Sequence, residues 1–257
     1  MVSMEQVKEL RDRTGVSVMQ CQKALVEAEG DMEKAIIILK KQSGATAAKK
    51  AGRDALAGVI VAKKVGNKVV ALTLNCETDF VAKNTDFLTL ANTLLDKAIE
   101  SGVPAAETAA AELVPLAVQK IGENIKLGSI TEKTTGGVLG VYIHNGQMGT
   151  IVELSGGDDA LAKDIAMHVT AMKPEYTTME EIPAEAIASV KEVFAKEVDA
   201  TKPADIQEKI LAGKIDSYLR ERVLVEQGFF KDTAIKVKDI ISKAGATVKS
   251  VTKLDIA

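Results

Sequence analysis

The chain has 257 residues, of which 46% are hydrophobic and 27% are charged, and its 33 basic and 36 acidic residues give a net charge of −3. A chain of this length exceeds one minimal core, which predicts two or three folded units. The slight acidic excess, the aromatic content of 3% and the lack of tryptophan argue against a protein that neutralises nucleic-acid phosphates or stacks on bases. We therefore expect no direct nucleic-acid partner.

The sequence also lacks the motifs of disulfide scaffolds, zinc sites and membrane proteins. Cys21 and Cys76 are far apart and form no CxxC motif. The opening, MVSMEQVKEL, is polar, and no apolar run approaches the ~20 residues of a membrane span. We expect a soluble cytoplasmic protein that has no membrane partner, no cofactor and no metal.

Three short helical patterns occupy residues 1–43 and predict a small three-helix domain. Gly15 is suited to end the first helix, and Ser17 and Asp31 are suited to cap the second and third. The expected core face of the second pattern consists of Met19, Ala24, Leu25 and Ala28. Residues 44–56, rich in Ala, Gly and Lys, are predicted to be a solvated linker.

From residue 57 the hydrophobic period changes from 3.6 to 2, which predicts strands. GVIVAKK and KVVALTL, joined by VGN, are typical of a hairpin. Two helical stretches follow, and Pro115 is expected to kink or break the second. The order of strand, Asn–Gly turn, strand and helix recurs from Gly137. The pattern predicts an α+β fold with two related α/β sandwich subdomains, residues 57–136 and 137–257, each with an antiparallel sheet.

Residues 183–226 carry narrow apolar stripes on two helical segments that are separated at Lys202-Pro203. These stripes predict an antiparallel helical hairpin inserted into the second subdomain. The following TAIKVKDIISKAG is predicted to be a helix. ATVKSVTKLDI is predicted to be a strand that returns to the second sheet, because a lone edge strand would be unstable.

Candidates for catalysis are few, because the chain has two histidines. His168 lies in an apolar helical run and is interpreted as a core-edge residue with one hydrogen bond, whereas His144 lies at a hairpin turn and is a candidate surface contact. A hydrolase built on Asp79 and His144 would need their side chains within hydrogen-bond distance, and no GxSxG or HExxH motif supports it. Glu77 and Asp79 supply two metal ligands at most, fewer than a metal site needs.

NCETDFVAKN, residues 75–84, places acidic side chains and a phenylalanine between a predicted strand and a predicted helix. From spacing alone, Asp79 would cap the following helix and Phe80 would close the core beneath it. The segment is, however, similar to the signature of the elongation factor Ts family, the guanine-nucleotide exchange factors of elongation factor Tu. Further segments match that family in the same order: LRDRTGVSVMQCQKALVEAEGDMEKAIIILKK, AAKKAGR, KIGENI and DIAMHVTAMKPEY.

The resemblance implies a function without covalent chemistry. The protein would bind elongation factor Tu carrying GDP and promote GDP release, so that GTP can rebind. Thr78, Asp79, Phe80 and Val81 would form the tip that enters the GTPase. Phe80 would be exposed in the free protein and insert between helices of the partner, while Asp79 would perturb the group network that holds the partner's magnesium ion.

The resemblance also implies contacts away from the tip. Ile121, Gly122 and His144 would be secondary contacts, and Lys8, Arg11 and Met19 would be contacts of the N-terminal domain. Gln147 and Met148 replace the basic residue that relatives carry after the turn glycine, which leaves the contacts there open. Whether two copies of the chain associate within the complex is also left open. The alternative is a binding adaptor without exchange activity, since the three-helix opening also resembles ubiquitin-associated (UBA) domains.

Overall fold

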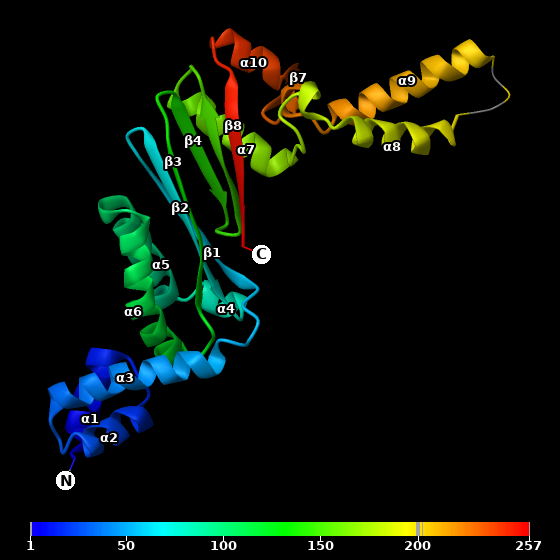
Figure 1. Ribbon diagram of the computed structural model, residues 1–257. Coiled ribbons are helices and arrows are strands. Elements are labelled where there is room, and N and C mark those ends of the chain that lie inside the picture. Colours follow the sequence, from blue (N-terminus) through cyan, green and yellow to red (C-terminus); the bar gives the residue numbers. More distant parts are fainter. Residues whose placement is uncertain (1, 199–200, 202, 257) are drawn as a thin grey trace.

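The structure is a computed structural model that describes residues 2–198, 201 and 203–256. It has the expected α+β fold and an elongated, curved shape (Figure 1). A helical bundle forms the N-terminal end, two sheets with their helices form the middle, and a helical hairpin projects at the other end. Within the described residues, no helix is both long enough and apolar enough to cross a membrane.

The N-terminal bundle consists of α1 (Met4–Thr14), α2 (Val18–Glu27) and α3 (Met32–Lys50). Its buried core is Val7, Leu10, Val16, Cys21, Ala24, Leu25, Ala28, Ala35 and Leu39. Asp31 caps α3 by accepting a hydrogen bond from the Lys34 amide, as expected, whereas Ser17 makes no side-chain capping bond.

Two expectations for this domain are corrected. Met19 is not in the core, because 65% of it is exposed, and Cys21 takes the buried position on that helix. The segment expected to be a linker begins as helix, since α3 continues to Lys50. The reason is tertiary: Ser43 is buried and Ala47 packs against the core of the next domain, so the helix spans from one core to the other.

The first sheet has the order β1-β2-β3, with β1 (Ala57–Val65), β2 (Lys68–Cys76) and β3 (Lys126–Thr134) all antiparallel. One face is covered by α5 (Thr85–Ser101) and α6 (Val103–Ile121). α6 is continuous through Pro115, so the expected break does not occur. β3 was not predicted, because its residues are mostly exposed or half-buried and therefore lack a continuous apolar pattern.

The second sheet repeats this arrangement in the order β4-β5-β8, formed by β4 (Val138–His144), β5 (Met148–Leu154) and β8 (Val248–Asp255). The predicted return of the last strand is thus confirmed. α7 (Asp159–Met172) and α10 (Val237–Lys243) pack in its core.

The two hairpins also share a steric detail. A Cβ at Gly58 would lie 2.3 Å from the Leu74 carbonyl oxygen, and one at Gly137 would lie 2.2 Å from the Leu154 carbonyl oxygen. Glycine is required at both positions for the same close approach of strands.

The two sheets share a buried cluster formed by Ile60, Val69, Ala71, Leu139, Ile151 and Leu254. β2 is consequently buried on both faces rather than half-buried, because Val70 and Leu72 face the helices while Val69 and Ala71 face the second sheet. This shared cluster therefore holds the two sheets in a fixed position relative to each other.

The helical hairpin consists of α8 (Ala184–Ala195) and α9 (Ala204–Arg220) and projects from the second sheet (Figure 1). Phe194 and Tyr218 meet edge to face across it, with ring centroids 5.3 Å apart. Pro203 precedes α9 as expected, and Lys202 lies outside the described residues. A short pair of strands, β6 (Gly228–Phe229) and β7 (Asp232–Lys236), follows. The predicted helix over residues 233–245 is therefore shorter than expected, because its first four residues belong to β7 and the helix itself covers Val237–Lys243.

Remaining short elements complete the chain. A single helical turn, α4 (Asp79–Ala82), lies between β2 and α5, and two 3-10 turns, η1 (Met179–Glu181) and η2 (Leu224–Glu226), flank the helical hairpin.

Candidate functional site

The candidate tip is α4 together with its capping residue, Thr78. Thr78 is the N-cap, and its hydroxyl accepts a hydrogen bond from the Val81 amide at 3.4 Å. Val81 packs against the first core and Ala82 is buried, whereas the Phe80 side chain points outward with 81% of the residue exposed. The spacing-based expectations for this turn are wrong, because Thr78 rather than Asp79 is the cap and Phe80 is not in the core. The exposure of Phe80 is what the family resemblance implies.

The backbone before the tip is held by one carboxylate, that of Glu123. Its Oε2 accepts hydrogen bonds from the amides of Glu77 and Thr78, at 3.1 and 3.0 Å, and its Oε1 accepts one from the Thr78 hydroxyl at 2.7 Å. Glu123 follows directly on Gly122, which ends α6 in the left-handed conformation at φ 92°. The end of α6 and the end of β2 are thus joined immediately behind the tip.

A second carboxylate, that of Glu77, connects the same two segments, but here the acceptor lies before the tip and the donor lies after α6. Glu77 Oε1 accepts from the Asn124 amide at 2.6 Å and from Arg53 Nη1 at 3.4 Å. Asn124 in turn donates its side-chain amide to the Arg53 carbonyl at 2.6 Å. The bond from the Asn124 amide lowers the pKa of Glu77, and the charge of Arg53 lowers it further. Glu77 is therefore ionised at neutral pH and ties residue 53 to the tip.

Cys76 lies under the tip. Burial, together with the charge of Glu123, raises the pKa of its thiol to about 11. The thiol stays protonated at neutral pH and donates a hydrogen bond to the Thr78 carbonyl at 3.1 Å. Asp79, by contrast, lies at the surface and pairs with Lys83 at 3.1 Å across one helical turn. An exposed pair of this kind opens at little cost, so the Asp79 carboxylate is available to a partner.

The turn of the second sheet lies beside the tip. Gly146 accepts a hydrogen bond from the Ile60 amide at 2.7 Å, and the Gln147 side chain donates to the Gly58 carbonyl at 2.9 Å. Gln147 therefore fixes the turn to β1. Between this turn and α4 runs a groove of about 510 Å³, lined by Ala57, Val59, Asp79, Ala82, Lys83, Leu88, Asn145, Gly146 and Gln147.

His144 and Asp79 do not form the pair that a hydrolase would need. The two ring nitrogens of His144 lie 3.0 Å from the Tyr142 hydroxyl and 3.3 Å from the Asn145 side-chain amide, and the carboxylate of Asp79 pairs with Lys83. His144 is exposed at the turn, as a contact residue would be. In the part of the chain that the structure describes, no group of three or more His, Cys, Asp or Glu side chains could hold a metal ion.

The other expected contact residues lie at or near the surface. Gly122 is exposed and Ile121 is half-buried against the first core, directly before Glu123. Lys8, Arg11 and Met19 are exposed on the N-terminal bundle. Lys8 and Arg11 line a shallow groove of about 450 Å³ together with Met4, Glu5, Val7 and Val18.

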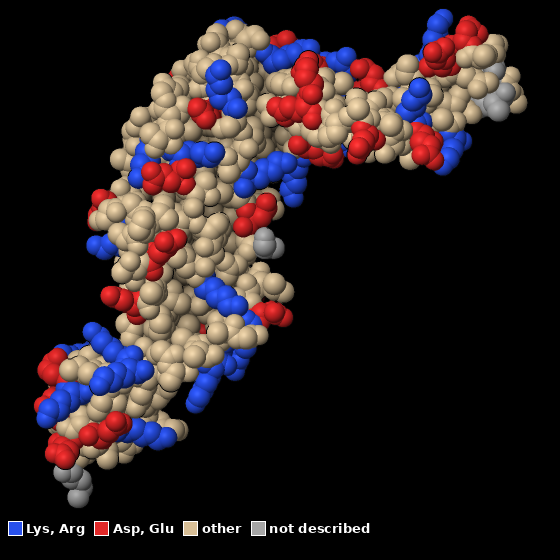
Figure 2. Space-filling model, viewed as in Figure 1, with Lys and Arg blue, Asp and Glu red and all other residues tan. Residues whose placement is uncertain are grey.

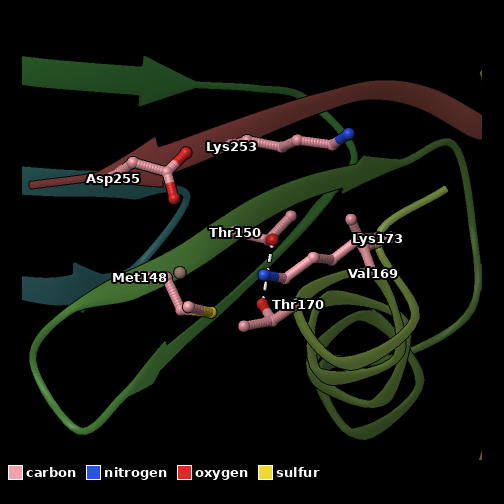
Figure 3. Close-up of a pocket in the computed structure, with 8 residues that line it drawn as sticks. Met148, Thr150, Val169, Thr170, Lys173, Lys253 and Asp255 are labelled. Atoms are coloured by element: carbon pink, nitrogen blue, oxygen red, sulfur yellow. Dashed lines mark hydrogen bonds between the residues drawn. The ribbon is translucent and has the colours of Figure 1, made fainter. Parts of the chain in front are cut away.

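The second subdomain holds a smaller pocket than the groove at the tip. The pocket drawn in Figure 3 has a volume of about 110 Å³ and lies between β5, α7 and β8, where the hydroxyls of Thr150 and Thr170 are 2.9 Å apart. None of the expected contact residues lines it. In the view of Figure 2, acidic and basic side chains alternate over the surface. A small pocket and a mixed surface favour recognition by an exposed apolar side chain.

Sequence reasoning did not single out Glu123, Asn124 or Arg53 as supports of the tip. They lie in segments matched to the family, GENI and AAKKAGR, but their role depends on the approach of α6 to the end of β2. A carboxylate directly after a helix-ending glycine is a weak signal by itself.

Comparison with known proteins fits this geometry. The family model described as elongation factor TS matches residues 77–257, which begin at the tip. The chain belongs to the elongation factor Ts family. Elongation factor Ts of Psychromonas ingrahamii is 44% identical over 99% of this chain and 90% of its own length. Elongation factor Ts of Hahella chejuensis is 41% identical over 99% of this chain and 92% of its own length. Elongation factor Ts of Arthrospira platensis is 45% identical over 88% of this chain and 97% of its own length. As a member of this family the chain is a translation elongation factor.

Proposed function

We propose that this elongation factor Ts chain is a guanine-nucleotide exchange factor that binds the GTPase elongation factor Tu and releases its GDP. Phe80 enters an apolar pocket between helices of the GTPase, and Asp79 disturbs the groups around the partner's magnesium ion. The protein itself forms no covalent bond and supplies no metal ligand. The observation that carries the proposal is the 81% exposure of Phe80 on a turn fixed by five hydrogen bonds to its capping region.

Exposure of this kind favours a contact role. A phenylalanine that served the fold would be buried, as Phe87 is on the next helix. Covering the Phe80 side chain on binding is worth about 1.5–3 kcal/mol. A thousandfold faster release requires a barrier lower by about 4 kcal/mol, so one inserted aromatic side chain and weakened contacts to a metal ion are of the right size.

Exchange requires that the factor bind the nucleotide-free GTPase more tightly than the GDP-bound form. By reciprocity, GDP affinity then falls by the same factor. The groove between α4 and the Asn145–Gln147 turn offers additional surface for this binding, because the apolar side chains of Val59 and Leu88 line it beside Asp79 and Lys83.

The test is stopped-flow release of a fluorescent GDP analogue from elongation factor Tu, with the wild-type chain, Phe80→Ala and Asp79→Ala. We expect strong acceleration by the wild type and at least a tenfold lower maximal rate for Phe80→Ala, because the buried contact is lost. Val65→Ala is the matched control: Val65 is 49% exposed and lies at the opposite end of the same β1-β2 hairpin.

Each outcome decides between the two functions. Acceleration that falls in Phe80→Ala, remains in Val65→Ala and leaves binding of elongation factor Tu largely intact supports exchange through the tip. Tight binding by the wild type without any acceleration would instead identify a binding adaptor and reject the exchange function. Binding carried entirely by residues 1–43 would point the same way.

A further inference from the structure

Neither the length of α4 nor the packing of Phe80 is enough to hold the tip in one position. α4 has four residues, too few to be stable as an isolated helix. Phe80 makes little contact with the rest of the chain, since 81% of it is exposed. Its position is therefore set by the backbone of α4 and by what holds that backbone, and not by packing of its own ring.

We infer that Glu123 is the positioning residue of the exchange tip, an inference that rests on the proposed function. Its carboxylate takes three hydrogen bonds, and all three come from the two residues that precede α4. No other side chain among the described residues accepts both the Glu77 and the Thr78 amide. Glu123 thus fixes the direction in which the chain leaves β2.

The bond to the Thr78 hydroxyl carries this effect into α4. A hydroxyl has one proton and two lone pairs, so donating to Glu123 leaves its oxygen to accept from the Val81 amide. The carboxylate thereby sets the orientation in which Thr78 caps α4. Phe80 lies within the single turn that this cap closes.

The remaining contacts support the same reading. The Thr78 carbonyl is held by the Cys76 thiol, and Glu77 is held by the Asn124 amide, the residue next to Glu123. Glu123 itself directly follows Gly122, the residue that ends α6. Because its oxygens face the backbone of the tip, Glu123 acts through Phe80 and need not touch the partner.

The first test uses the free protein and does not require exchange. The chain has no tryptophan, so Phe80→Trp introduces a single indole at the tip. Time-resolved fluorescence anisotropy of that variant should show slow tumbling with the whole protein. Adding Glu123→Ala should add a fast local component, and Glu123→Gln, which keeps one acceptor oxygen, should lie between the two. Glu107→Ala, an exposed acid on the same helix, is the matched control.

The second test is a double-mutant cycle on the rate of GDP release. Glu123→Ala should lower the maximal rate about tenfold, which corresponds to a release barrier higher by about 1.4 kcal/mol. The concentration of factor at half-saturation should change by less than about twofold. In the Phe80→Ala background, the same Glu123 change should have almost no further effect, because the side chain that it positions is gone.

The outcomes separate this inference from the proposed function. Equal losses from Glu123→Ala with and without Phe80, or anisotropy unchanged by Glu123→Ala, would overturn the positioning role. A wild-type chain that does not accelerate GDP release would reject the exchange function, while the anisotropy measurement would still decide whether Glu123 orders the tip. Melting temperatures of all variants show whether a loss reflects unfolding.

Discussion

At the residue scale, His168 shows how a buried imidazole is used for structure. It is 0% exposed, its Nδ1 accepts a hydrogen bond from the Phe230 amide at 3.2 Å, and its Nε2 lies 2.9 Å from Gln227 Oε1. Because a backbone amide can only donate, the proton must be on Nε2, which donates to Gln227. The neutral ring thus joins α7 to the segment that follows the helical hairpin, with two hydrogen bonds where the sequence predicted one.

This arrangement predicts a dependence of stability on acid. Burial lowers the pKa of His168 below its ordinary value of 6.5, and the bond to Gln227 opposes the shift only in part. The unfolded chain then takes up a proton before the folded protein does, so stability is complete above the unfolded pKa and is lost as pH falls toward the folded one. Urea unfolding at about pH 8 and about pH 5.5 should show a larger loss for the wild type than for His168→Gln, which has no imidazole to titrate. An equal loss in both proteins would assign the acid sensitivity to other groups.

At the element scale, the base of the helical hairpin depends on Glu226. Its carboxylate is 9% exposed and accepts from Arg220 at 2.5 Å, Lys236 at 2.8 Å and Lys238 at 2.9 Å. The hydrogen bonds from the two lysines and Arg220 lower the pKa of Glu226 to about 2. One anion therefore connects the end of α9 with β7 and α10.

Replacing Glu226 should loosen the hairpin before it unfolds the body. We expect Glu226→Gln to cost about 1–3 kcal/mol at neutral pH, since three cations lose a shared partner. Limited proteolysis should cut faster between α8 and α9, and the melting temperature should fall. Glu192→Gln is the control, because its pair with Lys196 is exposed and is worth less than about 1 kcal/mol. Unchanged proteolysis in Glu226→Gln would mean that the apolar cluster of Ile182, Leu219 and Val223 suffices to hold the hairpin.

The elements that sequence reasoning found and missed differ in where their stability comes from. α1, α5 and the hairpins carry their own apolar periodicity and caps, and they could be read from the chain. β3 is visible only through its pairing with β2, and the extension of α3 only through the burial of Ser43 and Ala47 between two domains. The same holds at the site. The sequence around Phe80 could be matched to a family, but the contact between Glu123 and Thr78 joins residues 45 positions apart and is seen only in the folded chain.

At the scale of the whole molecule, the end of α6 is where separate parts of the chain meet. Lys120 lies against Gly15 of the N-terminal bundle and pairs with Asp86 of α5 at 2.8 Å. Lys50, the last residue of α3, donates to the Gly122 carbonyl. Glu123 then holds the tip. The N-terminal bundle and the tip are thus positioned by one short segment, so that two separate surfaces can meet a partner in a fixed relation.

Because the N-terminal bundle and the tip are held in a fixed position relative to each other, we predict that they contribute differently to exchange. If the bundle binds and the tip acts, binding at the bundle raises the local concentration of the tip at the GTPase. Charge reversal of Lys8 and Arg11 to Glu should therefore raise the half-saturating concentration of the factor about tenfold at low salt, with the maximal release rate nearly unchanged. The effect should shrink as salt is added, because exposed charges are screened.

The control reverses two exposed lysines elsewhere on the same bundle, Lys23 and Lys41, and should leave both parameters unchanged. Phe80→Ala should show the opposite pattern, with the maximal rate lowered and half-saturation kept. A fall in maximal rate on reversal of Lys8 and Arg11, at saturating factor, would contradict the division. It would mean that the bundle takes part in the release step itself, and that the α6 end transmits its binding to the tip instead of only holding both in place.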